Sequence, residues 1–306
     1  MNSTELNTGI TLIITYPGWL FRVTISFLMT LFFIIFVYFT IIILNVFFTT
    51  PQVRETARYI LFIHMLLNDL VYLLISFMLF TFSGYNIRVT VPICLVISSF
   101  PGCMFRITPY NLALMSLERY TAICHPLRYA ELCTAQRSGL AIVYMWTVGT
   151  IPELSNVIAY CCSVDPRTFN LNVICDWRSL TVSNAQVVIK TFTDILSFSM
   201  VGLIIAYTYV KVMLVARRMD SKASKAGKTV LLHGFQLLLS MLSFTTTLTE
   251  TYLMTYFTFL PYINFFLVMS LPRFVSPLIY GIRDEVFGKA MRKFHLGRML
   301  SLCSRK

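Results

Sequence analysis

The chain has 306 residues, of which 57% are hydrophobic and only 12% are charged. This composition excludes a water-soluble globular protein, because it supplies too little polar surface to cover a folded domain of this length. The formal net charge is +12, but the basic residues gather in short segments between apolar runs, which argues against a nucleic-acid-binding surface.

Seven apolar runs are long enough to cross a membrane, because a helix needs roughly 20 mainly apolar residues to span the hydrocarbon core. They lie near residues 23–49, 59–83, 91–121, 139–160, 187–215, 229–257 and 262–282. We therefore expect an all-α membrane protein, in which residues 23–282 form a bundle of seven transmembrane helices. No removable signal peptide is expected in residues 1–22, because they lack the charged, apolar and small-residue pattern of one.

The basic residues predict the orientation of this bundle. The segments after the first, third, fifth and seventh runs carry two, three, five and seven Lys or Arg residues, if Arg119 at the end of the third run is included, whereas the N-terminal segment and the other loops together carry four. Cytoplasmic loops are rich in Lys and Arg, so we expect residues 1–22 to be extracellular and residues 283–306 to be cytoplasmic. The basic segments then face the anionic lipid of the inner leaflet. Asn2 begins an Asn-Ser-Thr triplet and is a predicted glycosylation site.

Three stretches of the chain resemble signatures of one receptor family. MSLERYTAICHPLRY at residues 115–129 resembles M-A-Y-D-R-Y-V-A-I-C-x-P-L-R-Y of the odorant receptors, a branch of the rhodopsin-like G-protein-coupled receptors, with Glu118 in place of the usual Asp. KAGKTVLLH at residues 225–233 and PRFVSPLIYGIRDEVF at residues 272–287 resemble two further signatures of that family. The Glu-Arg-Tyr form of the first stretch is most similar to fish odorant receptors. Pro126 is expected to end the third helix directly after His125.

The resemblance implies a function, a location and a set of partners. It implies a plasma-membrane receptor, not an enzyme, in which a small extracellular odorant binds the helix bundle and activates a heterotrimeric G protein that raises cyclic AMP. Arg119 would contact the α subunit of that G protein. The residues implied for coupling and switching are Glu118, Arg119, Tyr120, Tyr207, His233 and Tyr280.

The resemblance also implies a disulfide between Cys94 and Cys175, while Cys161 and Cys162 stay unassigned. We expect no cofactor and no metal, because the histidines are scattered without the spacing of metal ligands.

Seven ionisable side chains fall at predicted membrane depth, where each costs about 3 kcal/mol and needs a partner or a function. They are Asp69, Arg106, Glu153, Lys190, Asp194, Glu250 and Arg273. We expect Lys190 and Glu250, near helix ends, to reach water. We expect Asp69 and Arg273 to form a buried ion pair that takes the place of the sodium ion bound by many rhodopsin-like receptors.

Arg106 lies thirteen residues before Arg119 on the third predicted helix and therefore faces the extracellular half of the bundle. The sequence does not decide which group it contacts there. It either pairs with Glu153 and Asp194 as a structural cluster or also contacts an anionic ligand. A third alternative is that the two acids prefer a cationic ligand. The candidate ligand-binding residues are Gly102, Phe105, Arg106, Glu153, Thr191, Asp194, Ile195, Phe244, Thr245 and Leu248.

Residues 283–306 are predicted to contain an amphipathic helix that lies along the inner leaflet. Two other functions stay open. A rhodopsin-like receptor for an endogenous amine, lipid or peptide shares the bundle but not the KAGKTVLLH and ICHPLRY signatures. A small transporter or channel would favour two repeated halves, which this sequence does not show.

Overall fold

The structure is a computed structural model that describes residues 3–176, 179–218, 238, 260–274 and 287–288. The predicted sixth span and the predicted cytoplasmic helix lie almost wholly outside these ranges. Six candidate residues also lie outside the described part of the chain: Asn2, His233, Phe244, Thr245, Leu248 and Tyr280.

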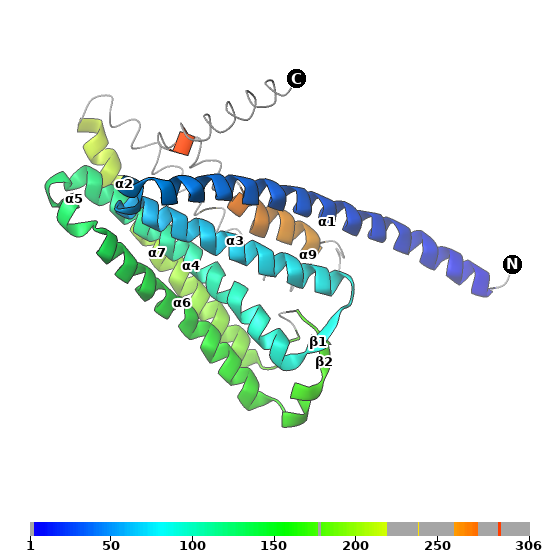
Figure 1. The fold of residues 1–306 in the computed structure, drawn as a ribbon. Coiled ribbons are helices and arrows are strands. Elements are labelled where there is room, and N and C mark those ends of the chain that lie inside the picture. The colour runs from blue at the N-terminus through cyan, green and yellow to red at the C-terminus, as the bar shows by residue number, and fades with distance from the viewer. Residues whose placement is uncertain (1–2, 177–178, 219–237, 239–259, 275–286, 289–306) are drawn as a thin grey trace, which may run out of the picture.

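Five long helices make up most of the described chain (Figure 1). They are α1 (Ser3–Thr49), α3 (Ala57–Gly84), α4 (Val91–Cys124), α6 (Ala135–Ser163) and α7 (Asn184–Arg218). By length and composition, the segments Val23–Thr49, Ala57–Gly84, Val91–Cys124 and Asn184–Val215 are able to cross a membrane. The helices expected from the apolar runs are therefore confirmed within the described residues.

The start of α1 differs from expectation, because the helix begins at Ser3 and not near residue 23. Its first turns extend beyond the other helices (Figure 1). Pro17 and Gly18 lie inside the helix although both are poor helix formers. The residue types therefore gave no local signal for the earlier start, and the apolar window still begins at Val23.

Short elements connect the long helices. They are α2 (Pro51–Arg54), β1 (Arg88–Thr90), α5 (Pro126–Leu132), η1 (Pro166–Asn170), β2 (Asn172–Ile174), α9 (Leu260–Ile263) and the π-helix η2 (Asn264–Ser270). Proline opens α2, α5 and η1, as expected for the first turn, where a backbone N–H has no intrahelical partner. Pro126 thus separates α4, which ends at Cys124, from α5.

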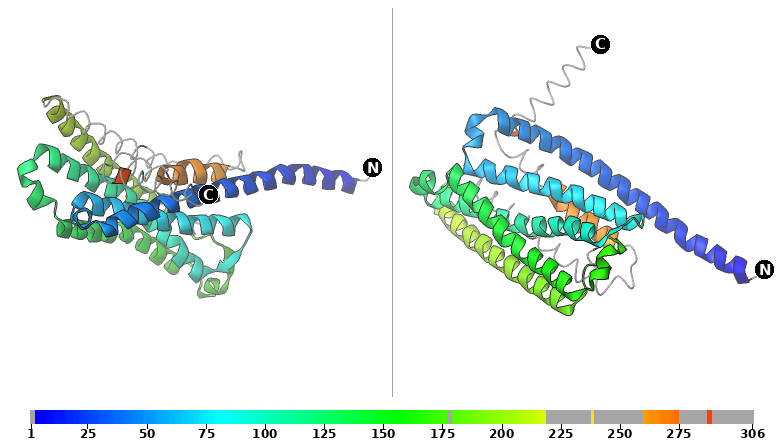
Figure 2. Two further views of the ribbon diagram at one scale, coloured as in Figure 1. Left: turned by 45° about the horizontal axis from the view of Figure 1, so that its top comes forward. Right: turned by 60° about the horizontal axis from the view of Figure 1, so that its bottom comes forward.

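Helix α4 lies at the centre of the bundle and packs against α3, α6 and α7 (Figure 2). Pro101 and Pro109 lie inside it, which neighbouring helices make tolerable in a membrane. The largest core cluster joins α1, α3 and α4 through side chains such as Phe36, Phe62 and Leu112. Large apolar side chains of α1, α6 and α7 point outward, as expected of surfaces that face lipid: Phe27, Ile41, Tyr144, Ile158, Leu203 and Val210.

The two ends of α4 define the two ends of the bundle. At the first, β1 and β2 pair antiparallel with Arg88 opposite Ile174, and a disulfide joins Cys94 to Cys175. We call this the disulfide end. The other is the Glu118 end, where α4 meets α5. The β2 segment is therefore held against the start of α4 by both hydrogen bonds and a covalent bond.

Candidate functional site

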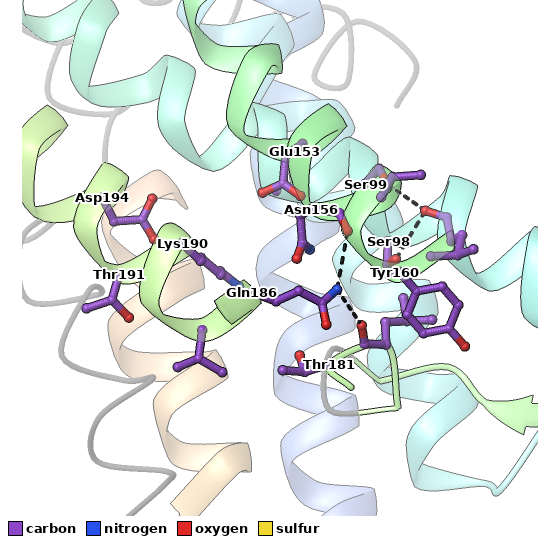
Figure 3. A pocket seen from close by; sticks show the side chains of 15 residues that line it. Ser98, Ser99, Glu153, Asn156, Tyr160, Thr181, Gln186, Lys190, Thr191 and Asp194 are labelled. Carbon is purple, nitrogen blue, oxygen red and sulfur yellow. Dashed lines mark hydrogen bonds between the residues drawn. The ribbon is translucent and has the colours of Figure 1, made fainter. Parts of the chain in front are cut away.

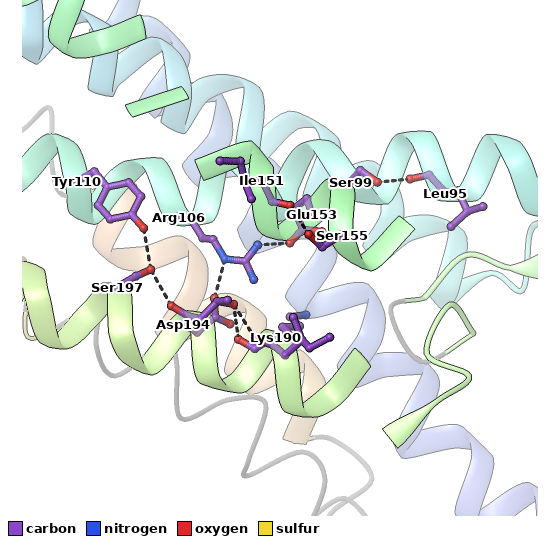
Figure 4. A network of polar contacts seen from close by, with 12 residues as sticks. Leu95, Ser99, Arg106, Tyr110, Ile151, Glu153, Ser155, Lys190, Asp194 and Ser197 are labelled. Atoms are coloured by element: carbon purple, nitrogen blue, oxygen red, sulfur yellow. Dashed lines mark hydrogen bonds and ion pairs between the residues drawn. The ribbon is translucent and has the colours of Figure 1, made fainter. Parts of the chain in front are cut away.

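A buried cluster of three charged side chains joins α4, α6 and α7. The Arg106 Nη1 atom donates to Glu153 Oε1 at 2.5 Å, and Arg106 Nε donates to Asp194 Oδ1 at 2.6 Å (Figure 4). All three side chains are buried. We call these residues the Arg106 cluster. Because they come from three different helices, their charges fix the relative positions of α4, α6 and α7.

A cavity of about 90 Å³ lies between these three helices toward the disulfide end (Figure 3). This exceeds the roughly 10–15 Å³ that one water molecule requires. Its wall combines carboxylates, an ammonium group, amides, hydroxyls and apolar side chains: Leu95, Ser98, Ser99, Gly102, Glu153, Asn156, Val157, Tyr160, Leu180, Thr181, Gln186, Val187, Lys190, Thr191 and Asp194. Such a mixture suits a small polar organic molecule.

The Gln186 side chain forms hydrogen bonds that link two segments at the edge of the cavity. Its Oε1 atom accepts from the backbone N–H groups of Val182 and Ser183 at 2.9 and 3.0 Å. Its amide nitrogen donates to the Asn156 carbonyl oxygen at 3.2 Å. One side chain therefore ties the loop before α7 to α6.

The structure brings some of the sequence-predicted ligand residues to the cavity and leaves others away from it. Gly102, Glu153, Thr191 and Asp194 line it. Ile195 is half exposed on the outside of α7, because successive helical residues point about 100° apart and Asp194 already faces inward. Phe105 does not line the cavity and packs against Phe198 instead, with 6.0 Å between the ring centroids. We therefore leave Phe105 and Ile195 out of the proposed site. Several cavity residues were not anticipated: Ser98, Ser99, Asn156, Tyr160, Gln186 and Lys190.

Gly102 makes the close approach of Glu153 possible. A Cβ atom at position 102 would lie 2.5 Å from Glu153 Oε1, the oxygen that Arg106 contacts. We expect Gly102→Ala to displace this carboxylate and to destabilise the protein by about 1–3 kcal/mol, the usual cost of overpacking. Thermal unfolding of the purified protein in lipid nanodiscs measures this loss.

The matched control is Gly139→Ala in α6, because a Cβ atom there would meet nothing within 4 Å. It should be as stable as the parent or slightly more stable, since alanine favours a helix over glycine. Equal unfolding temperatures for the two variants would show that protein stability does not depend on the absence of a Cβ atom at position 102.

A second buried ion pair joins α3 to residue 273. Arg273 Nε lies 3.2 Å from Asp69 Oδ1, and Arg273 Nη1 donates to the Met269 carbonyl at 2.9 Å. The guanidinium also lies over the ring of Tyr72, 3.8 Å from its centroid. Thr108 donates to the same Asp69 oxygen at 3.2 Å. The two residues expected to pair are therefore in contact, and a hydroxyl and an aromatic face add to the pair.

The Glu118 end holds the arginine of the first signature stretch. Arg119 Nε lies 3.7 Å from Glu118 Oε2, and the Tyr129 hydroxyl donates to Glu118 Oε1 at 2.7 Å. Burial and then this hydrogen bond raise the pKa of Tyr129, so its hydroxyl stays protonated at neutral pH and keeps donating. Glu118 is thus held by one side chain from α4 and one from α5.

Two tyrosine rings and a histidine lie close together at this end of α4. The Tyr120 ring lies 5.9 Å from the ring of Tyr207 on α7, and the Tyr120 hydroxyl lies 3.2 Å from His125 Nε2. Four of the residues implied for coupling, namely Glu118, Arg119, Tyr120 and Tyr207, therefore come together. Within the described residues, no group of three His, Cys, Asp or Glu side chains is placed to hold a metal ion.

Comparisons with known proteins agree with this arrangement. A family profile described as "7 transmembrane receptor (rhodopsin family)" matches residues 40–283. The chain is 28% identical to "Odorant receptor 131-2" of Danio rerio over 81% of the chain and 78% of that protein. It is 22% identical to "Olfactory receptor 56A3" of Homo sapiens over 79% of the chain and 80% of that protein. It is also 35% identical to "Olfactory receptor 2M3" of Homo sapiens over 28% of the chain and 30% of that protein.

Proposed function

This chain belongs to the rhodopsin family of seven-transmembrane receptors, and from that premise we propose that it is an odorant receptor that activates a heterotrimeric G protein. The observation that carries the proposal is the similarity to an odorant receptor over four fifths of both chains. A polar cavity between α4, α6 and α7 supports it, because a receptor for small molecules needs such a space.

The proposed arrangement places the disulfide end outside the cell and the Glu118 end in the cytoplasm. Residues 1–22 are then extracellular and residues 283–306 cytoplasmic, in a multi-pass protein of the plasma membrane. The distribution of Lys and Arg supports this orientation. The odorant would enter the cavity from outside, and Gly102, Glu153, Thr191 and Asp194 would form part of its wall.

Activation would shift a population between two arrangements of the bundle. In the described arrangement, Glu118 holds Arg119 and Tyr129 holds Glu118. A ligand that binds the alternative arrangement more tightly would release Arg119 toward the α subunit of the G protein. Tyr120 follows Arg119 in the chain and its ring lies 5.9 Å from that of Tyr207, so both tyrosines would border the same contact surface.

Cyclic AMP in cells that express the receptor with a stimulatory olfactory G protein tests this function. We expect a response to at least one small water-soluble odorant, and we expect Arg119→Ala to abolish it at unchanged surface expression. The matched control is Arg167→Ala, which removes an exposed arginine at the opposite end of the bundle. A receptor that responds equally well without Arg119 would refute the proposed coupling surface.

A further inference from the structure

The charged groups of the cavity wall are arranged in order of depth. On α7, Gln186, Lys190 and Asp194 all line the cavity, and a spacing of four residues puts them on one helical face. Gln186 lies nearest the disulfide end, Lys190 lies one turn deeper, and Asp194 lies deepest. Glu153 faces Asp194 from α6, and both carboxylates point into the space between the helices (Figure 3).

Arg106 is not positioned to bind an anionic ligand in this cavity. Two of its nitrogen atoms already donate to Asp194 and Glu153, and Arg106 lines a neighbouring cavity of only about 10 Å³ in place of this one. A ligand carboxylate at Arg106 would be a third anionic group beside the carboxylates of Glu153 and Asp194, and like charges held this close repel one another.

The two carboxylates, in contrast, retain capacity to accept hydrogen bonds. Arg106 uses Oε1 of Glu153 and Oδ1 of Asp194, and an ionised carboxylate has two oxygens with about four acceptor positions. No hydrogen bond from the described residues reaches the second oxygen of either. Two carboxylates share one guanidinium, so the deep wall carries an excess of negative charge that suits a cation.

Lys190 adds a positive group to the same wall, about 6 Å nearer the disulfide end than Asp194 on the basis of the helical rise. Its side chain extends from α7 into the space between α7 and α6 (Figure 3). A ligand carboxylate near the entrance would therefore have an ammonium group beside it, whereas one at depth would meet the carboxylates of Glu153 and Asp194.

We propose that the cavity binds a small zwitterion, a molecule that carries both an ammonium group and an anionic group. The inference rests on the proposed receptor function and names the ligand class of its site. The ligand's ammonium group would donate to Glu153 and Asp194, and its anionic group would contact Lys190. The hydroxyl and amide side chains of Ser98, Ser99 and Asn156 provide further hydrogen bonds between the two charged groups.

The test compares straight-chain amino acids with amines, carboxylic acids and alcohols of matched chain length. Cyclic AMP is measured in cells that express the receptor, and ligand-induced thermal stabilisation is measured on the purified receptor in nanodiscs. We expect the amino acids to be at least about tenfold more potent than the amines or acids, which corresponds to about 1.4 kcal/mol. Amino acids that carry the amino and carboxyl groups at opposite ends of the carbon chain, tested over a series of chain lengths, report the spacing between the cationic and anionic subsites of the cavity.

Two cavity variants test which side chain contacts the anionic group of the ligand and which contacts its ammonium group. Lys190→Gln should lower the potency of the amino acids by about tenfold or more without weakening the amines. Asp194→Asn keeps the volume of the side chain and should weaken amino acids and amines alike. The control is Arg167→Gln, an exposed cation of the disulfide end that does not line the cavity.

The two readouts separate this inference from the proposed function. Strongest activation by an acid or an alcohol, or equal effects of Lys190→Gln on amines and amino acids, would overturn the zwitterion while the receptor function stands. Thermal stabilisation by amino acids without any cyclic AMP response would support the ligand class and refute the proposed coupling. Neither stabilisation nor activation by amino acids, with correctly folded receptor at the surface, would also overturn the ligand class.

Discussion

Replacing Arg106 with alanine is expected to remove most of the protein from the cell surface. The substitution removes the guanidinium that pairs with both Glu153 and Asp194 and leaves the two carboxylates buried close to each other. Breaking a buried ion pair from one side costs about 3–5 kcal/mol, which is a large fraction of the stability of an ordinary domain. Surface labelling of intact cells and thermal unfolding in nanodiscs measure the loss.

Further variants show whether the loss arises from unpaired charge. Arg106→Lys keeps the charge but not the fork that reaches two carboxylates, so it should be intermediate. The triple variant Arg106→Met, Glu153→Gln, Asp194→Asn removes all three charges and should recover much of the surface expression, since buried ionic clusters are often replaceable by neutral side chains. A triple variant as unstable as Arg106→Ala would contradict this account.

Exchanging the charges of Asp69 and Arg273 in one double variant is expected to restore part of the surface expression that each single charge reversal removes. Asp69→Arg places two guanidinium groups together, and Arg273→Asp places two carboxylates together, at a point where the native atoms are 3.2 Å apart. Both single variants should express poorly. The double variant should express better than either, with a coupling of about 0.5–3 kcal/mol, as is usual for residues in contact.

The rescue should be partial, because other contacts of the pair depend on the native arrangement. Tyr72 presents its ring to the guanidinium, and Thr108 donates to the carboxylate. We also expect replacement of extracellular sodium by a bulky cation to leave signalling unchanged, since Arg273 supplies the positive charge beside Asp69. A sodium-dependent response, or a double variant no better than the single ones, would refute the proposed role of the pair.

The sequence was a good guide to the helices and to the charges that need partners. Long apolar runs predict membrane helices because the hydrocarbon core leaves no other partner for the backbone. The same environment makes a charge at depth conspicuous, so Arg106, Glu153 and Asp194 were expected near one another. The sequence left open whether Arg106 contacts a ligand, and the geometry favours pairing with both acids.

The details of the cavity were less predictable from the sequence. Ser99 bonds to the carbonyl of Leu95 in its own helix, so a hydroxyl in a membrane helix does not by itself indicate a cavity. Lys190 was expected to reach water, although its spacing of four residues from Gln186 and Asp194 was a usable signal. The strands β1 and β2 have three residues each, which is too short for an alternating pattern to appear.

The central position of α4 has a consequence for how this receptor would acquire new ligands during evolution. A substitution in α4 disturbs its packing with three other helices at once, and Gly102 leaves no room for even one added carbon. Asn156, Val157 and Thr191 line the cavity from α6 and α7 and are only partly buried. New ligand preferences should therefore arise most readily through substitutions at these positions of α6 and α7. The tight packing of α4 limits how far the shape of the cavity can change.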